Sequence, residues 1–86
     1  MIGRKLKRIA AHRQVIVITH LAQVAAFADA HVRVTKNVAR GKTRVAIEPL
    51  GESERAAEIA RMLAGAAPSP QAAAHADEML RAARDA

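Results

Sequence analysis

The sequence predicts an α/β fold built from a helix, one strand of the parallel type, a short helix, a β-hairpin and two C-terminal helices. Three observations predict it. Residues 15–18 form the unbroken β-branched run VIVI, the pattern of a strand that is covered on both faces. Residues 31–36 and 43–48 alternate between apolar and polar side chains on either side of Gly41, as the strands of a hairpin do. Most other large apolar side chains recur at helical spacing.

A basic amphipathic helix is predicted over residues 3–12, because its apolar side chains recur three or four residues apart with lysines and arginines between them. After the strand at residues 15–18, a second apolar stripe predicts a short helix over residues 21–30. A parallel strand needs neighbouring strands, and no other segment of the sequence has that pattern. We therefore expect the chain to be part of a larger fold.

The predicted hairpin has an apolar face and a basic face. Alternation places Val32, Val34, Val45 and Ile47 on one side, which we expect to face inward, with lysines and arginines facing outward. Gly41 in the connection tolerates the positive φ that a tight turn requires. Cations on an exposed strand also discourage edge-to-edge pairing, so this charge has a structural explanation as well.

A helix is predicted over residues 52–64. Its first turn is acidic, which suits the helix dipole, and Gly65 can end it. Its apolar stripe consists of Ile59, Met62 and Leu63.

The last helix is predicted over residues 71–86, after a linker at residues 66–70. Ser69 is the expected N-cap, and Pro70 suits the first helical position. We expect residues 1–65 to form one unit that carries the candidate site. The apolar stripe of the last helix is Ala72, Ala73, Ala76, Met79, Leu80 and Ala83.

Charge is distributed unevenly along the chain. Residues 1–47 carry ten lysines and arginines against one acid, a net +9, whereas residues 48–86 carry −3. A basic half attracts nucleic acid or nucleotide phosphate through a field that does not depend on sequence. A solvated surface explains the same charge.

Composition excludes several classes of site. There is no cysteine, so disulfides and thiolate metal sites are absent, and the histidines have no zinc-ligand spacing, so no metal site is predicted. No apolar run approaches the ~20 residues that span a bilayer. We expect a cytoplasmic chain without a membrane partner.

His20 directly follows the predicted strand. A polar residue at the end of a parallel strand lies at the carboxyl edge of the sheet, where open α/β folds bind ligands. A histidine at a strand-to-helix turn is also commonly a hydrogen-bonded structural residue. Position alone therefore leaves both roles open.

Three stretches together resemble a known family. RQVIVITHLAQVAAFAD at residues 13–29, the basic hairpin and ERAAEIARMLAG at residues 54–65 look like the C-terminal end of the ATPase head of the RecN family. These are bacterial proteins of DNA double-strand-break repair, related to SMC and ABC ATPases. The resemblance runs from about Gly3 through AHADEML at residues 74–80. The family's usual proline is Ala22 here, which removes a fixed φ from the turn after His20.

The resemblance implies the C-terminal piece of a P-loop ATPase head of the ABC/SMC type. His20 would be the switch histidine of the His-loop and would contact the γ-phosphate of ATP, with Thr19 and Gln23 beside the nucleotide. ATP and Mg would be cofactors only of the complete head. Phosphoryl transfer depends mainly on positioning and on stabilising charge, and an imidazole can serve both.

The remaining nucleotide motifs are absent from the sequence. It contains no Walker A loop, no LSGGE-like signature and no strand that ends in Asp-Glu. We therefore expect the isolated chain to have no ATPase activity and no cofactor. The resemblance implies as partners the remainder of the head, a second head in a homodimer, and DNA through the full-length protein. It also implies a role in recombination and a location at the nucleoid.

Two other interpretations stay open. The chain could be a small stand-alone nucleic-acid-binding module that uses the basic helix and the hairpin, although it has no Trp or Tyr on which bases could stack. It could instead be a protein-interaction module without enzymatic activity.

Overall fold

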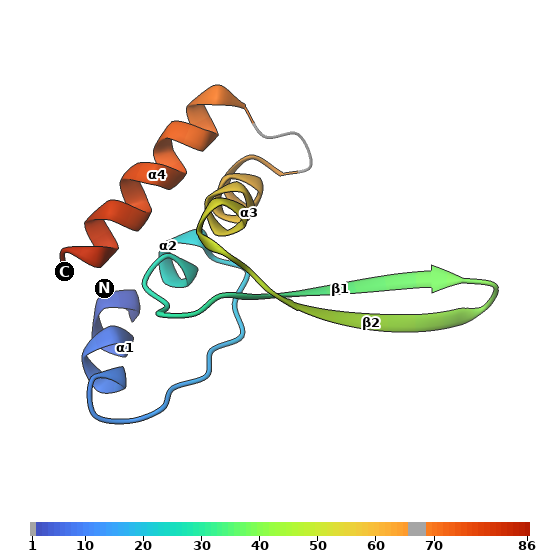
Figure 1. Ribbon diagram of the computed structural model, residues 1–86, viewed down its shortest axis with the longest axis horizontal. Coiled ribbons are helices and arrows are strands. Elements are labelled where there is room, and N and C mark those ends of the chain that lie inside the picture. Colours follow the sequence, from blue (N-terminus) through green and yellow to red (C-terminus); the bar gives the residue numbers. More distant parts are fainter. Residues whose placement is uncertain (1, 66–68) are drawn as a thin grey trace.

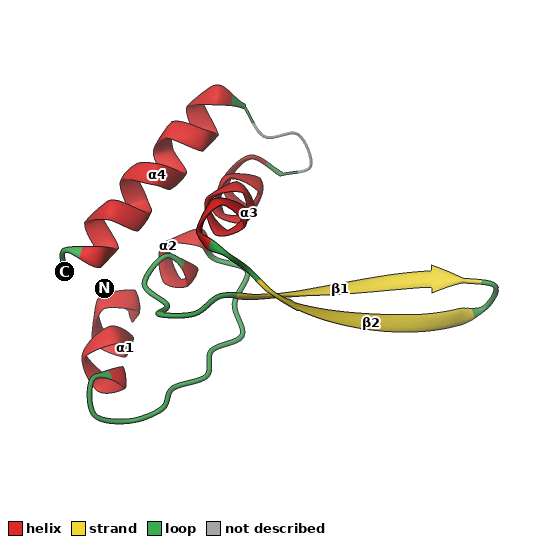
Figure 2. Ribbon diagram, viewed as in Figure 1, coloured by secondary structure: helices red, strands yellow, loops and turns green. Residues whose placement is uncertain are grey.

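The computed structural model describes residues 2–65 and 69–86. Its helices gather at one end, and a long hairpin projects from them (Figures 1 and 2). The extents of the molecule are 45 × 34 × 21 Å. The elements are α1 (Ile2–Ala10), α2 (Ala22–Ala25), β1 (Val32–Ala39), β2 (Lys42–Pro49), α3 (Glu52–Ala64) and α4 (Pro70–Arg84). This mixture of helices with an antiparallel hairpin confirms most of the predicted element order. Of the predicted linker at residues 66–70, residues 66–68 lie outside the described part.

The core lies where α2 and α4 pack against α3. Among the described residues, Ile59 is the one large side chain that is fully buried. The other buried members of the core are alanines, with larger side chains packed around them at partial exposure. The buried alanines are Ala22, Ala25, Ala26, Ala60, Ala72, Ala76 and Ala83.

The start of α4 confirms the predicted cap. The Ser69 hydroxyl accepts a hydrogen bond from the Ala72 N–H at 3.1 Å, and Pro70 occupies the first turn. At the other end of the chain, the Lys7 ammonium donates to the carbonyl oxygens of Ala83, Arg84 and Ala86. The lysine thereby joins α1 to the end of α4 and to the residues that follow it.

The predicted strand at residues 15–18 is wrong for this chain. These residues lie in a loop between α1 and α2 (Figure 2). The sheet contains β1 and β2 alone among the described residues. Ile16 is 83% exposed and Ile18 is 98% exposed. A strand requires a neighbouring backbone with which to exchange hydrogen bonds, and no other described segment pairs with these residues.

The predicted orientation of the hairpin is also wrong. Val34 pairs with Ile47 across the strands, and both side chains are exposed, at 61% and 69%. Val32 and Val45 lie on the same exposed face. Arg33, on the opposite face, is half-buried because it turns toward α3. The hairpin leaves the helices near its base, so its apolar face stays exposed within residues 2–65 and 69–86.

Both early helices are shorter than predicted. α1 ends at Ala10, two residues early, and α2 contains four residues of the ten expected over residues 21–30. After α2, the N–H groups of Phe27 and Ala28 bond three residues back, to Val24 and Ala25, in a tightened turn. The chain then turns away toward β1.

Candidate functional site

His20 and its predicted neighbours lie at the beginning of α2. The His20 side chain is exposed, Gln23 is exposed on α2, and Thr19 is half-buried. The Thr19 hydroxyl accepts a hydrogen bond from the Leu21 N–H at 3.0 Å. Among the described residues, no hydrogen bond joins the three side chains to one another. The backbone on both sides of His20 is therefore held, while the imidazole is open to solvent.

The position of His20 at a sheet edge stays a prediction. Residues 15–18, which were expected to deliver it there, form a loop in this chain. The site that the structure does describe is a short helical turn whose leading residue, Leu21, follows directly after His20.

Arg55 on α3 is the contact that sequence reasoning missed at this turn. Its Nη2 donates to the carbonyl oxygens of Ala25 at 3.3 Å, Ala26 at 3.1 Å and Ala28 at 2.5 Å. Burial lowers the pKa of this guanidinium, and the nearby Asp29 carboxylate partly opposes that. An arginine in proteins keeps its charge at any physiological pH, so a cation sits at the end of α2.

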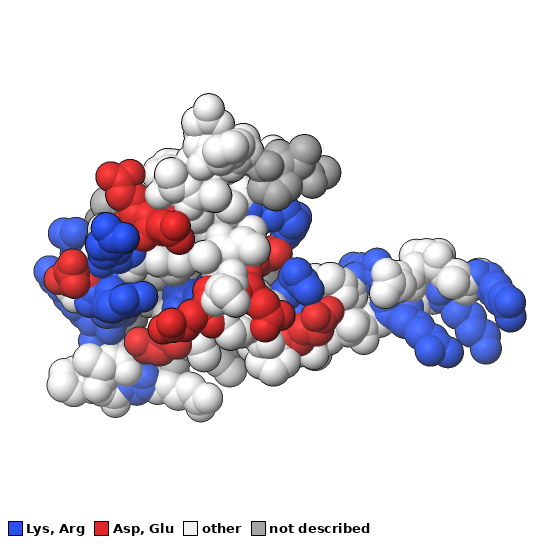
Figure 3. All heavy atoms as spheres, turned by 45° about the horizontal axis from the view of Figure 1, so that its top comes forward, with Lys and Arg blue, Asp and Glu red and all other residues white. Residues whose placement is uncertain are grey.

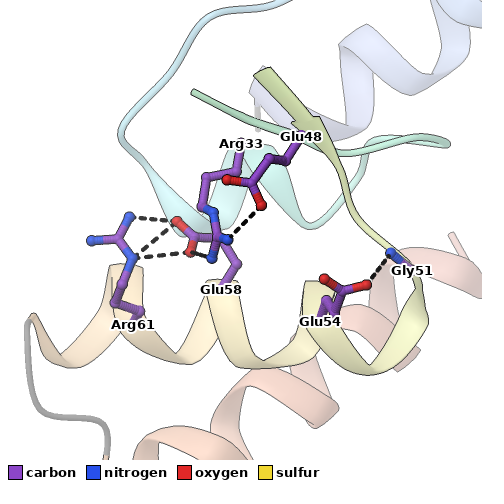
Figure 4. A network of polar contacts seen from close by, with 6 residues as sticks. All are labelled: Arg33, Glu48, Gly51, Glu54, Glu58 and Arg61. Carbon is purple, nitrogen blue, oxygen red and sulfur yellow. Dashed lines mark hydrogen bonds and ion pairs between the residues drawn. The ribbon is translucent and has the colours of Figure 1, made fainter. Parts of the chain in front are cut away.

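A second cluster centres on the buried Glu58 of α3 (Figure 4). Arg61 binds both carboxylate oxygens of Glu58, with its Nε at 3.1 and 3.0 Å. Arg33 of β1 lies 3.6 Å from the same carboxylate and donates to Glu48 of β2 at 3.0 Å. The hydrogen bonds from Arg61 lower the pKa of Glu58, against the effect of burial. This cluster attaches the base of the hairpin to α3.

His31 lies between the two clusters. Its side chain is half-buried, and its Nδ1 has no hydrogen-bond partner. Burial lowers its pKa, Arg55 lowers it further, and Glu58 raises it. The sequence signal for the second cluster was the spacing of Glu58 and Arg61, which lie three residues apart and so share one side of α3.

The described part of the chain offers little else as a site. Within residues 2–65 and 69–86, no group of three or more histidines or carboxylates is placed to hold a metal ion. No helix in the same ranges is both long and apolar enough to span a bilayer. A shallow hollow between α3 and α4 is lined by Ala56, Ala57, Ala60, Ala73 and Asp77, and none of the candidate residues borders it.

Comparison with known proteins says more about what this chain is related to than the geometry of the site does. No protein-family model matches the chain. A protein of Streptomyces coelicolor called DNA repair protein RecN is 49% identical over 83 residues, which are 96% of this chain. The protein of the same name from Mycobacterium leprae is 51% identical over 83 residues, and that from Bacillus subtilis is 40% identical over 82. The chain matches the C-terminal segment of RecN.

The match to RecN covers nearly all of this chain but a small part of the relatives. The chain spans 14% of the length of each of these three RecN proteins. The RecN match includes the loop with His20 and the helix with Arg55 and Glu58, because it extends over at least 95% of the chain.

Proposed function

We propose that the chain is the C-terminal part of a RecN-like DNA repair ATPase and that it contributes His20 as the switch histidine. In the completed head, of the P-loop ABC/SMC type, the imidazole contacts the γ-phosphate of ATP, with Thr19 and Gln23 beside the nucleotide. The preceding RecN polypeptide supplies the phosphate loop and the Mg-binding carboxylates. Two such heads meet as a homodimer, and the full-length protein acts on DNA in double-strand-break repair and recombination at the nucleoid.

One observation carries this proposal. The loop that leads into His20 exposes Ile16 and Ile18 almost fully, in a chain that spans 14% of its RecN relatives. Large aliphatic side chains stabilise a protein when they are removed from water, so this segment gains most when further polypeptide covers it. Covering the segment places His20 next to the added surface, while the held backbone of Thr19 and Leu21 keeps the imidazole pointing out of the packed helices.

Reconstitution tests the proposal. The chain is co-expressed with Streptomyces coelicolor RecN that lacks its matching C-terminal segment, and ATP hydrolysis by the complex is measured. We expect the complex to regain activity, and His20→Ala to lower kcat by at least about 100-fold, the effect of removing one group that stabilises transferred charge. The matched control is His75→Ala, an exposed histidine on α4. Assembly without ATP hydrolysis, or full activity of the His20→Ala complex, contradicts the proposal.

The isolated chain provides the complementary measurement. We expect no hydrolysis and no saturable ATP binding by calorimetry, because a lone imidazole cannot hold a triphosphate. Saturable binding at micromolar affinity would mean that the chain carries a nucleotide pocket of its own.

A second candidate function is a contact with nucleic acid through the tip of the hairpin. The tip carries four exposed cations, Lys36, Arg40, Lys42 and Arg44, and no acid (Figure 3). Among the described residues, none of the four pairs with a carboxylate. The tip stands away from the acidic side chains of the helices, so it meets a polyanion without repulsion. A two-stranded ribbon also fits the major groove of DNA.

Salt dependence of DNA binding tests this candidate. Replacing the four tip cations with glutamine should flatten the slope of log K against log salt by up to about 3–4, since each phosphate contact contributes about 0.9. The matched control replaces four cations of the N-terminal segment, Arg4, Lys5, Arg8 and Arg13, which removes the same charge. Equal losses in both variants would mean that net charge alone attracts the DNA.

A further inference from the structure

The helix that follows His20 cannot be stable by itself. α2 contains four residues, and a single turn of helix fixes several backbone dihedrals in return for one or two hydrogen bonds. Its N-cap residue, Leu21, provides no side-chain hydrogen bond. Something outside α2 must therefore keep the turn folded.

Two kinds of contact hold this turn. Ala22, Ala25 and Ala26 are buried against α3 and the core. Alanine side chains remove little surface from water, so their burial gives limited stabilisation. The polar contact is Arg55, whose guanidinium group binds three carbonyl oxygens at the end of the turn. The Ala25 carbonyl also accepts from the Ala28 N–H at 3.1 Å, and Ala26 and Ala28 follow the last residue of α2, so the guanidinium joins the end of the helix to the segment after it.

A continuous series of hydrogen bonds leads from Arg55 to both neighbours of His20. Arg55 Nη2 binds the Ala25 carbonyl, and the Ala25 N–H binds the Leu21 carbonyl at 3.0 Å. The Leu21 N–H in turn binds the Thr19 hydroxyl at 3.0 Å. The backbone of His20 lies between Thr19 and Leu21. Loss of the bonds at the far end releases the turn that fixes the direction of the imidazole.

We propose that Arg55 is a positioning residue that sets the orientation of His20 by closing the C-terminal end of α2. The inference rests on the proposed role of His20, because orientation matters only if the imidazole acts on the nucleotide. Without the guanidinium, α2 unwinds part of the time and His20 points in more directions. ATP still binds to the rest of the head as before. His20 is then correctly placed to stabilise the transferred phosphate in a smaller fraction of the ATP-bound complexes. The expected signature is a lower kcat with a nearly unchanged KM.

The test uses the reconstituted complex with Streptomyces coelicolor RecN. Arg55→Met keeps an unbranched apolar stem and removes every donor. We expect kcat to fall by roughly 10- to 100-fold, the size of a small displacement of a catalytic group, and KM for ATP to change less than threefold. Arg81→Met is the matched control: it removes an exposed arginine of α4 without touching α2, and should leave kcat within about twofold.

A double-mutant cycle separates positioning from general damage. In the His20→Ala complex, Arg55→Met should cause no further loss, because the group that it positions is already gone. If Arg55→Met lowers kcat by the same factor in the unmodified complex and in the His20→Ala complex, the inference is overturned while the role of His20 stays intact. If His20→Ala itself has no effect, the proposed function fails instead, so the two failures can be told apart.

Amide hydrogen exchange in the 86-residue chain gives a readout that does not depend on activity. Arg55→Met should speed exchange at Ala25 and Ala26 at least tenfold and leave the amides in the middle of α4 unchanged. Arg55→Lys, which keeps a cation with three donors, should give an intermediate rate. Unchanged exchange in α2, or equally faster exchange in α4, would overturn the inference even if the complex fails to assemble.

Discussion

The packed helices and the projecting hairpin differ in which side chains they use. The helical end is held by Ile59 and a set of alanines, whereas the hairpin and the loop before α2 carry most of the chain's exposed valines and isoleucines. A fully buried Val or Ile side chain contributes roughly 1.5–3 kcal/mol, far more than an alanine. The side chains best suited to form a core therefore lie outside the core of this chain.

The difference shows which apolar surfaces are buried within the chain and which stay exposed. α3 and α4 pack closely because alanines let their backbones approach, and the ion pairs of Glu58 fix the hairpin at its base. Beyond that base, Val34, Val38 and Ile47 are largely exposed. A domain of this size is marginally stable even when its large side chains are buried. We expect the open surfaces to be covered in the RecN-like head proposed above.

The largest expected effect is at the centre of the packed half. Ile59→Ala should lower the free energy of unfolding by about 2–5 kcal/mol, because it leaves a cavity among alanines that cannot fill it. Ile47→Ala, an equal deletion in the hairpin, should change it by less than about 0.5 kcal/mol. Urea denaturation followed by circular dichroism measures both. Similar losses at the two sites would mean that the hairpin face is packed in solution, and the contrast between the regions would fail.

A smaller effect is expected where α1 joins the packed half. Gly3 is buried, and a Cβ atom there would overlap the ring of Phe27 and approach the Gln23 carbonyl oxygen to 3.1 Å. Alanine gains about 1 kcal/mol in helix propensity over glycine, but overpacking costs about 1–3 kcal/mol. Gly3→Ala should therefore destabilise the chain by about 1 kcal/mol in the same assay. Adding Phe27→Leu should restore part of the loss, whereas a net gain from Gly3→Ala would show that α1 is free of α2.

The sequence predicted local features well where one segment determines them. Ser69 and Pro70 define the start of α4 through their own chemistry, and Gly41 marks the hairpin turn at a φ of 73°. Helical spacing around Ile59 also gave the buried side of α3 correctly. These predictions need no information about the rest of the fold.

The sequence failed where a feature depends on a partner. The VIVI run has the composition of a covered strand, but a strand exists only when another backbone pairs with it. The hairpin faces were reversed because alternation shows that two faces differ and does not show which one the rest of the chain covers. Arg55 was missed as a site residue because its acceptors are backbone carbonyls, which have no sequence signature. The placement of His20 at a sheet edge needs strands outside this chain and stays a prediction.

A pH effect is expected at the junction of the two regions. Burial and Arg55 hold the pKa of His31 below its usual 6.5, so the fold favours the neutral imidazole. At acidic pH the unfolded chain therefore binds more protons than the folded chain. The folded state has its full stability above pH 6.5 and loses part of it as the pH drops from 6.5 toward the pKa of His31 in the folded chain. Glu58, whose pKa is also lowered, stays ionised until below pH 4.5. When the pH is lowered from 7.5 to 5.5, the midpoint of urea denaturation should fall less for His31→Gln than for the unmodified chain. His12→Gln, which replaces an exposed histidine, is the control.

The smallest expected effect concerns the hairpin alone. Arg40 and Gly41 form its two-residue connection, with φ values of 53° and 73°. A turn of this kind has positive φ at both positions and favours Asn-Gly, because an ordinary side chain is strained there. Arg40→Asn should stabilise the hairpin by up to about 1 kcal/mol, and Arg40→Val should weaken it. Hydrogen exchange of the cross-strand amides measures the stability of the hairpin, and urea denaturation followed by circular dichroism measures the stability of the helices. If the two regions are independent, Arg40→Asn slows exchange in β1 and β2 without moving the helical midpoint. A parallel shift of both would mean that the chain unfolds as one unit, with the exposed valines coupled to the alanine core.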